Sequence, residues 1–414
     1  MKRLLLLFLT AVFLVACGQP NTEINEKETL VIGLYPIIFD RLRNAIFDFN
    51  KNNPLYYIEV KEYEDSGQLI IDITTDKAPD IILLPSHFMM NIYADKGVFV
   101  DLYPFLDNDS AINRIDLQEN ILEAYEISGQ LLGMPINYVI DTVATARSNV
   151  GEIYSWNLNE IFEFADKQLP ESNFFQNHSK SAILNICLAA NGDVLIDWNN
   201  GGIFNRDLFF KILNFSDRFI PDTFYSGKSN IFEQIEENHI IFFSRTIGSI
   251  ILLQIIQHEF SEQVAFPGFP AEVGSGNIAH SEILLAINQK CSNQEVAWSF
   301  ISSLLTEKFQ VHNSGMYLPI RKSALESHLS ENKKGSWLLT GTDIVFDFYP
   351  ATEEEKQQMR DLIASVTKTR KWDMRIEDIL YEEAQTFLNG FKSAEEAANI
   401  AANRIEIYIN ELYK

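Results

Sequence analysis

The stretch "TLVIGLY" (residues 29–35), followed by "IIFDRLRNAIFDFNKNNP" (residues 37–54), decides the fold class. The first stretch is rich in branched apolar residues and favours a buried strand. In the second, Phe39, Leu42 and Ile46 recur at helical spacing, and the closing Asn-Asn-Pro predicts the end of the helix. The opening therefore predicts a strand that runs directly into a helix.

The same alternation continues along the chain. "YYIEVKEY" (56–63) predicts a second strand, and "GQLIIDITTDKAPDIILLPS" (67–86) predicts a short helix followed by the buried strand 81–84. "HFMMNIYADKG" (87–97) then reads as a helix that Gly97 ends. Strands and helices in this rhythm predict a parallel sheet that is covered on both faces.

The middle and the end of the chain predict further elements of both kinds. Strand-like runs flank Pro135, turn residues predict a hairpin over 191–204, and strand character returns near Val264. The last sixty residues are helical in pattern. Two capping boxes predict helix starts, formed by Asn157 with Glu160 and by Ser393 with Glu396.

The first residues predict export and a lipid anchor. A short positive start precedes an apolar run from Leu4 to Ala16, which is shorter than the roughly 20 residues that a spanning helix needs. Small residues then precede Cys17, an order that resembles the lipobox of bacterial lipoproteins. We expect a signal peptide over 1–16, a lipid on Cys17 and a polar tether over 17–28. An ordinary secretory signal in which Cys17 is incidental is the alternative.

The composition excludes some partners. The chain has 414 residues, is 46% hydrophobic and carries a formal net charge of −24 at pH 7. So acidic a surface repels nucleic acid, and we expect no nucleic-acid partner. It also disfavours adsorption on anionic lipid, which leaves the lipid on Cys17 as the expected attachment to the membrane.

Four stretches, taken in order, resemble the extracellular solute-binding proteins of bacterial ABC importers, of the carbohydrate-binding type found in Gram-positive bacteria. The stretches are "KAPDIILLPSHFMMNIYADKGVFVDLYPFLD" (77–107), "NGDVLIDWNNGGIFNRDLFFKILNFSDRF" (191–219), "FPGFPAEVGSGN" with "LLAINQKCSNQEVAWSFISSLLTEKFQ" (266–310) and "ILYEEAQTFLNGFKSAEEAANIAANRIEIYINE" (379–411). The resemblance implies an α/β, two-lobe periplasmic-binding-protein-like fold with a ligand cleft between the lobes.

The resemblance also implies that the chain crosses between the lobes three times. The expected crossings are near 135–138, 281–285 and 318–321. The expected lobes are 29–136 with 285–319, and 137–284 with 320–414. Cys187 and Cys291 would then lie on different lobes, where a disulfide would prevent closure. We therefore expect two buried free thiols, and a disulfide is the alternative.

Candidate ligand contacts follow from position. Sugar recognition needs flat aromatic faces and planar or charged polar groups. Tyr35, Ser86 and His87 lie at the carboxyl ends of two predicted strands, where ligands of such sheets bind. The full set of candidates is Tyr35, Ser86, His87, Asn137, Tyr138, Ser244, Arg245, Tyr317 and Trp372.

Each of the other candidates has its own basis and its own alternative. Asn137 and Tyr138 lie on the first crossing and Tyr317 lies beside the third. We expect Ser244 and Arg245 in a turn after the apolar run "HIIFF", although a surface salt bridge is the alternative for the arginine. Trp372 precedes the closing helices, and packing is its alternative; for Tyr35 the alternative is the core, and for Ser86 a helix cap.

Signals for catalysis are weak. The chain has no Gly-x-Ser-x-Gly, His-Glu-x-x-His or Gly-Lys-Ser/Thr stretch, and its seven histidines form no close pair on a helix. We therefore expect no enzyme, no cofactor and no metal site.

These observations predict a monomeric, lipid-anchored binding protein on the extracytoplasmic face of the cell membrane. It would capture a small solute, a mono- or oligosaccharide, by lobe closure and deliver it to an ABC permease. A non-sugar solute such as a peptide or polyamine is one alternative. A surface carbohydrate hydrolase is the other, since carboxylates are abundant.

Overall fold

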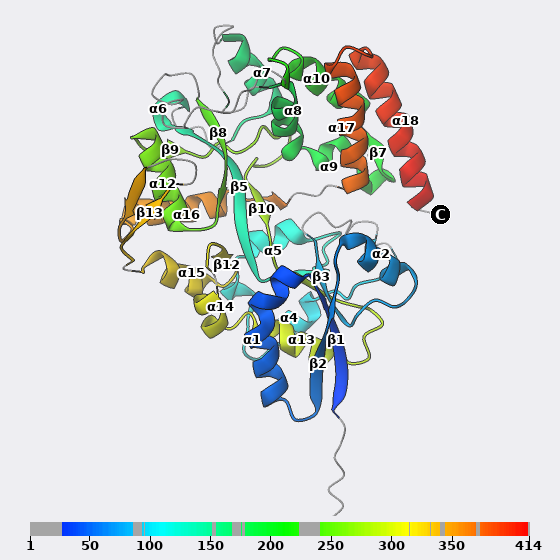
Figure 1. Ribbon diagram of the computed structural model, residues 1–414, viewed down its shortest axis with the longest axis vertical. Coiled ribbons are helices and arrows are strands. Elements are labelled where there is room, and N and C mark those ends of the chain that lie inside the picture. Colours follow the sequence, from blue (N-terminus) through cyan, green and yellow to red (C-terminus); the bar gives the residue numbers. More distant parts are fainter. Residues whose placement is uncertain are drawn as a thin grey trace, which may run out of the picture.

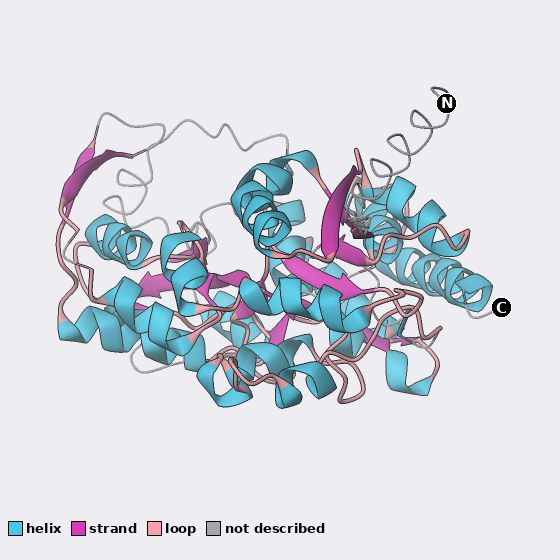
Figure 2. Cartoon of the chain, turned by 90° about the horizontal axis from the view of Figure 1, so that it is seen from below, coloured by secondary structure: helices cyan, strands magenta, loops and turns pink. Residues whose placement is uncertain are grey.

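Figure 1 shows a computed structural model of the chain, and its strands lie in two main sheets, one in each half of the molecule. Helices lie on both sides of the strands (Figure 2). The structure describes residues 27–85, 93–94, 96–150, 155–167, 175, 179–222, 241–313, 315–331, 333–339, 344–369 and 373–412.

The first sheet lies in the lower half of Figure 1 and has the strand order β2-β1-β3-β11-β4. β2 and β3 pair in parallel with β1, whereas β11 runs antiparallel to β3 and β4. This confirms the parallel core that the opening stretches predict. The strands are β1 (Glu28–Leu34), β2 (Tyr56–Glu62), β3 (Ile81–Leu84), β4 (Met134–Pro135) and β11 (Leu284–Ile287).

The first helix illustrates how the local sequence sets the structure. α1 (Pro36–Asn52) begins with a proline, which is preorganised for the first turn. Ile38, Leu42 and Ile46 are buried on one face, four residues apart. The other helices described in this half are α2 (Ser66–Thr74), α4 (Tyr103–Asn108), η1 (Arg114–Asp116), α5 (Glu119–Tyr125), α13 (Gln294–Ser303), α14 (Glu307–Asn313) and α15 (Lys322–Leu329).

The second sheet is built around one long strand, β5, which pairs antiparallel with β8, β9, β10 and β12. β15 adds in parallel to β10. The strands are β5 (Asn137–Ala146), β8 (Phe242–Ile247), β9 (Val264–Ala265), β10 (Ile278–His280), β12 (Leu318–Pro319) and β15 (Lys368–Thr369).

Helices and two hairpins complete the upper half. The helices are α6 (Arg147–Val150), α7 (Leu158–Lys167), α8 (Lys180–Ala189), α9 (Gly192–Leu195), η2 (Trp198–Asn200), α10 (Arg206–Ser216), α12 (Ile250–Phe260), α16 (Glu353–Ala364), α17 (Met374–Leu388) and α18 (Ala394–Leu412). The hairpins pair β6 (Ile196–Asp197) with β7 (Ile203–Phe204), as predicted, and β13 (Gly335–Leu338) with β14 (Val345–Phe348).

Both predicted capping boxes are confirmed. At the start of α7, the Glu160 amide donates to Asn157 Oδ1 (3.0 Å), and the Asn157 amide donates to Glu160 Oε2 (2.7 Å). At the start of α18, the Glu396 amide donates to Ser393 Oγ (3.2 Å), and the Ser393 amide donates to Glu396 Oε2 (2.9 Å). Each box satisfies amides that the first helical turn leaves without a partner.

The chain passes between the two sheets three times, from β4 to β5, from β10 to β11 and from β11 to β12. The first two passages are short. Ile136 separates β4 of the first sheet from β5 of the second, and the segment 281–283 separates β10 from β11. The Ile136 amide donates to the carbonyl oxygen of Ile283 (2.8 Å), so these two segments lie side by side. The lobe boundaries given above stay a proposal.

Two large clusters of buried side chains hold the molecule together. One joins the first sheet to β5, α12 and α16, and the other joins α8 and α10 to α17 and α18. Cys187 and Cys291 are both buried free thiols, as expected. Burial raises the pKa of both thiols, to about 12 for Cys291.

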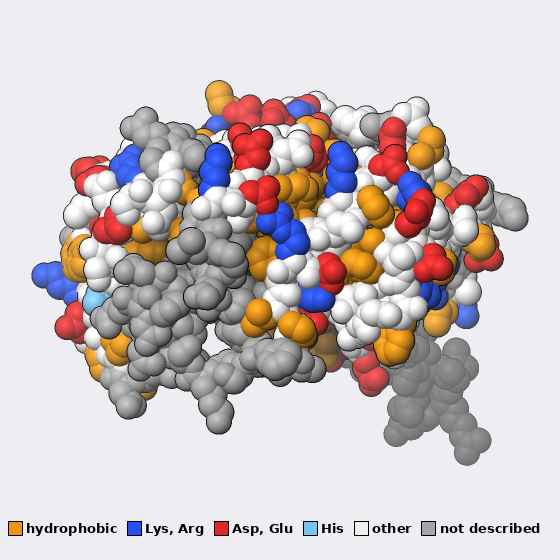
Figure 3. Space-filling view, turned by 90° about the horizontal axis from the view of Figure 1, so that it is seen from above, with side chains coloured by type: hydrophobic (Ala, Val, Ile, Leu, Met, Phe, Trp, Pro, Cys, Tyr) orange, Lys and Arg blue, Asp and Glu red, His pale blue; other side chains and the backbone are white. Residues whose placement is uncertain are grey.

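The surface carries charge of both signs. On the face shown in Figure 3, acidic and basic side chains are interspersed. Within the described part of the chain, no helix combines the length and the hydropathy that crossing a membrane requires.

Candidate functional site

Four tyrosines, Tyr35, Tyr63, Tyr93 and Tyr125, gather over the carboxyl edge of the first sheet. Tyr35 directly follows β1, and β11 begins beside the end of β3 because Leu284 pairs with Leu84. Both leucines belong to one buried cluster, which includes Tyr93 and against which Tyr35 and Tyr125 pack. Aromatic side chains are therefore grouped at the carboxyl ends of these strands.

The hydroxyl group of Tyr35 makes no hydrogen bond within the described part of the structure. Its Oη is buried and has no hydrogen-bond partner among the described residues. Burial raises the pKa of Tyr35 to about 12, and the charge of Asp65 adds to this effect. The phenol is therefore protonated near neutral pH, and a group that could pair with it would remove the cost of a buried, unpaired hydroxyl.

Tyr125 connects the tyrosine edge to the second sheet. Its Oη accepts a hydrogen bond from the amide of Ser281 (2.6 Å), which lies between β10 and β11. The pKa of Tyr125 is raised, mainly by burial and further by the charge of Asp141. The charge of Asp141 on β5 therefore contributes to the electrostatic environment of the Tyr125 phenol.

Asp141 is the centre of a small polar group on the second sheet. Thr246 of β8 donates from Oγ1 to Asp141 Oδ1 (2.6 Å), and His280 of β10 places Nδ1 3.6 Å from Asp141 Oδ2. The side chains of Asp141 and His280 are 24% and 42% exposed. A carboxylate, a hydroxyl and an imidazole thus meet where all three can reach a solute.

The start of α17 carries a buried carboxylate. Tyr408 of α18 donates from Oη to Asp373 Oδ2 (2.9 Å), while Asp373 Oδ1 caps the amides of Arg375 and Ile376. Burial raises the pKa of Asp373. The pKa of Tyr93 is raised by burial and, to a lesser extent, by the charge of Asp373.

Two of the predicted residues, Asn137 and Tyr317, line a separate cavity of about 460 Å³ beside α1. Tyr317 donates from Oη to Glu282 Oε1 (2.8 Å), and Glu282 forms an ion pair with Arg41. The Arg41 guanidinium also lies over the Tyr317 ring, 5.0 Å from its centroid. Asn137 Oδ1 accepts from the amide of Ile283 (3.2 Å). This cavity lies at the segments that join the two sheets.

Three predicted residues have other surroundings. Tyr138 has no exposed surface and belongs to the large core cluster, because its side chain lies on the face of β5 that packs inward. The expected turn at Ser244 and Arg245 is wrong, since β8 continues through Ile247. Ser244 is exposed on that strand. Arg245 pairs through Nη2 with Glu259 Oε2 (2.8 Å), which is the salt bridge named above as the alternative.

The other predicted positions lie outside the described residues. These are Ser86, His87, Trp372 and the lipidation site Cys17.

Sequence reasoning missed Tyr93, Tyr125, Asp141, Thr246, His280 and Asp373. One signal was available for Asp141, which is the single charged residue of the otherwise apolar or small stretch "NYVIDTVATA". A carboxylate inside such a strand costs free energy unless it has polar partners, so it marks a polar site. The tyrosines carried no comparable signal, because tyrosines are common in cores.

Comparisons with known proteins agree with this architecture. A family model described as bacterial extracellular solute-binding protein matches residues 44–335. No curated protein sequence matches the chain.

Several solved structures share the fold. The sugar-binding protein MalE from the phytopathogen Xanthomonas citri is 15% identical, with a TM-score of 0.60 over 92% of this chain and 98% of that chain. An ABC substrate-binding protein from Listeria monocytogenes in complex with cycloalternan is 16% identical, with a TM-score of 0.54 over 93% and 100%. A periplasmic oligogalacturonide-binding protein from Yersinia enterocolitica is 13% identical, with a TM-score of 0.58 over 93% and 100%.

The family model covers well over half of the sequence, and these structures share the two-lobe α/β fold. The chain belongs to the bacterial extracellular solute-binding proteins.

Proposed function

We propose that this protein captures a mono- or oligosaccharide between its two lobes and, once closed around it, delivers it to an ABC permease. The observation that carries the proposal is the place of Tyr125: it shares a cluster with Tyr35 and Tyr93, and it bonds the amide of Ser281, the neighbour of His280 in the polar group around Asp141. Tyrosine rings supply flat apolar faces, and protonated phenols donate hydrogen bonds. The Asp141 carboxylate can accept hydrogen bonds from sugar hydroxyls. A sugar, with apolar ring faces and hydroxyls that both donate and accept, fits this set of groups.

The proposed site also suits lobe closure. Tyr35 and Tyr93 belong to the first half, whereas Asp141 and Asp373 belong to the second. A solute that contacts both sets gains more contacts in the closed form, and this difference in affinity favours closure. The structures named above for sugar ligands support a carbohydrate as the solute.

A binding screen tests the solute class. The melting temperature of the purified protein would be measured with mono- and oligosaccharides, with short peptides and with polyamines as separate arms. We expect a saturable rise with a sugar, because a ligand that binds only the folded state stabilises it by mass action. Stabilisation by a peptide alone would contradict the assignment, and turnover of aryl glycosides would indicate a hydrolase instead.

We further propose that the mature chain is held at the extracytoplasmic face of the cell membrane by a lipid on Cys17. The apolar run that ends before Cys17 is too short to span a bilayer, and the acidic chain does not favour adsorption to anionic lipid. Cys17→Ala should move the protein from the membrane fraction to the soluble fraction with its melting temperature unchanged. Retention of Cys17→Ala on membranes after a high-salt wash would contradict the anchor.

A further inference from the structure

A groove of about 840 Å³ lies beside α12, between the β13–β14 hairpin and α16. It shares no residue with the polar group around Asp141. α12 packs on the face of β5 that carries Ile140, and Asp141 points to the opposite face because side chains alternate along a strand. The groove is therefore a feature of the second sheet's outer side, separate from the proposed solute site.

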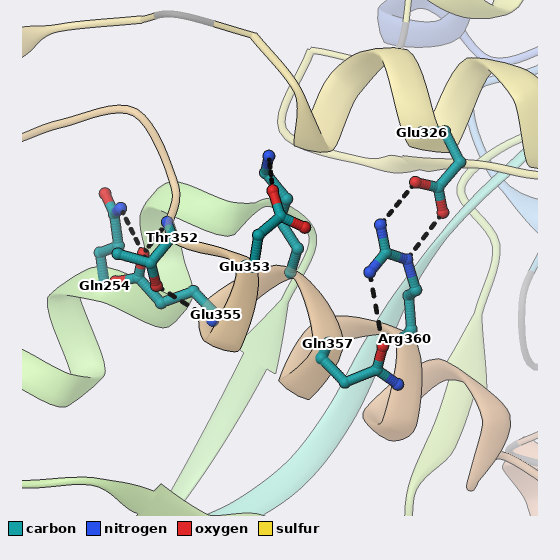
Figure 4. Close-up of polar contacts among 8 residues, drawn as sticks. Gln254, Glu326, Thr352, Glu353, Glu355, Gln357 and Arg360 are labelled. Atoms are coloured by element: carbon teal, nitrogen blue, oxygen red, sulfur yellow. Dashed lines mark hydrogen bonds and ion pairs between the residues drawn. The ribbon is translucent and has the colours of Figure 1, made fainter.

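A buried amide oxygen of Gln254 lacks a partner in this groove. Gln254 is 2% exposed, and its Nε2 donates to the carbonyl oxygen of Tyr349 (3.1 Å) and to Glu355 Oε2 (3.3 Å). Both partners are acceptors, so the amide nitrogen must face them and the orientation is fixed. Oε1 then has no donor among the described residues, and in Figure 4 it points away from Glu355. A ligand that supplies an N–H or O–H donor would remove this cost.

Glu355 adds a buried carboxylate with no basic partner. It is 5% exposed and accepts from the Thr352 amide (2.7 Å), from Thr352 Oγ1 (3.0 Å) and from Tyr349 Oη (3.0 Å). Its neighbours on α16 differ. Glu353 pairs with Lys356, and Arg360 pairs with Glu326, the second pair being drawn in Figure 4. No ion pair reaches Glu355 in the described part of the structure, so hydrogen bonds and the amino end of α16, rather than a basic side chain, stabilise its carboxylate.

The rim of the groove strengthens this negative character. Among the described lining residues, Glu262, Asp347, Glu354 and Asp361 are further acids, whereas Arg147 is the single Lys or Arg. Arg147 is already bonded to Gln263 Oε1 (2.9 Å). No group of three or more His, Cys, Asp or Glu side chains in the described residues is arranged to hold a metal ion. Carboxylates spread along a groove suit a long cation with several charges better than a single ion.

We propose that this groove binds a linear organic cation of the polyamine class, independently of the solute between the lobes. One terminal ammonium group donates to Gln254 Oε1, since an ammonium offers three donors and no acceptor. The other ammonium groups pair with Asp347, Glu354 and Asp361 at the rim. Tyr349 also lines the groove and is 47% exposed, so its ring is accessible to a cation.

Calorimetric titration with spermidine at low salt tests the proposal. The groove variant Asp347→Asn/Glu354→Gln/Asp361→Asn keeps the side-chain shapes and removes three charges. Its affinity should fall roughly 3- to 150-fold, because exposed ion pairs contribute little individually and add over three sites. The matched control is Asp48→Asn/Glu59→Gln/Glu295→Gln, which removes three exposed carboxylates that lie outside the groove. It should bind spermidine as the wild type does.

Two further variants locate the bound cation. Gln254→Met removes the unpaired oxygen at similar volume and should weaken spermidine binding while sugar binding is unchanged. Asp141→Asn should leave spermidine binding unchanged, because Asp141 lies outside the groove. The proposal is overturned if the wild type shows no saturable binding, if the control variant loses as much affinity as the groove variant, or if spermidine competes with the sugar. If the protein bound spermidine but no sugar, the result would contradict the proposed function and leave the groove proposal standing.

Discussion

Replacing Tyr35 by phenylalanine should have opposite effects on stability and on binding. The Oη of Tyr35 is buried and has no partner among the residues that the structure describes, and an unpaired buried polar group costs about 1–3 kcal/mol. Tyr35→Phe should therefore raise the free energy of unfolding of the unliganded protein by about that amount, as measured in urea. If the phenol bonds a solute hydroxyl, the variant loses about 0.5–1.5 kcal/mol of binding, which is roughly a 2- to 13-fold weaker Kd by calorimetry.

Tyr63→Phe is the matched control. Tyr63 lies near Tyr35, is 2% exposed, and donates from its Oη to Asp72 Oδ2 (2.7 Å). Its loss should lower stability by about 1.5–3 kcal/mol, because the bond is to a carboxylate, and should leave solute affinity unchanged. If Tyr35→Phe binds the solute as tightly as the wild type, Tyr35 is a core residue and the tyrosine edge does not hold the solute through this hydroxyl.

Three further predictions concern the second sheet and α17. Asp141→Asn should weaken solute binding about 10- to 150-fold in calorimetry, because a hydrogen bond to a charged group contributes about 1.5–3 kcal/mol. An unchanged Kd would show that Asp141 does not contact the solute. Arg245→Ala should lower stability to urea, since it removes the ion-pair partner of the Glu259 carboxylate, whose side chain is 10% exposed. The affinity for the solute should not change. Weaker solute binding without a loss of stability would indicate that Arg245 contacts the ligand. The raised pKa of Asp373 means that its protonated form favours the folded state, so its contribution is full below the ordinary carboxyl pKa and is lost as the pH rises through the raised value. Asp373→Asn, which can still cap α17, should remove this part of the pH dependence in urea titrations from pH 4 to 7; an unchanged slope would show that Asp373 is not its source.

The sequence predicted the elements of the first half well because their patterns are local. The opening strand and helix, the strands at 56–63 and 81–84 and both capping boxes depend on neighbours within one or two turns. The strand after Phe243 was missed because "SRTI" is polar at its start. Pairing with β5 keeps these residues extended through Ile247, and pairing partners far along the chain are not visible in a local pattern.

The candidate site was only partly predictable for the same reason. Tyr35 was found because a strand end marks it. Asp141, Thr246 and His280 come from three strands that meet only through their register, in which Asp141 pairs with Ile278 on one side and with Thr246 on the other. Tyr138 was selected for its place on a crossing, yet the alternation of side chains along β5 turns it into the core.

The central claim, capture of a sugar by closure of the two lobes, is tested most directly by small-angle X-ray scattering. The purified protein would be measured alone and with a saturating amount of the sugar that stabilises it most, with Asp141→Asn at the same sugar concentration as the control. The account predicts a smaller radius of gyration for the wild type with sugar and a weaker response for the variant. An identical scattering profile with and without bound sugar would contradict closure as the mechanism.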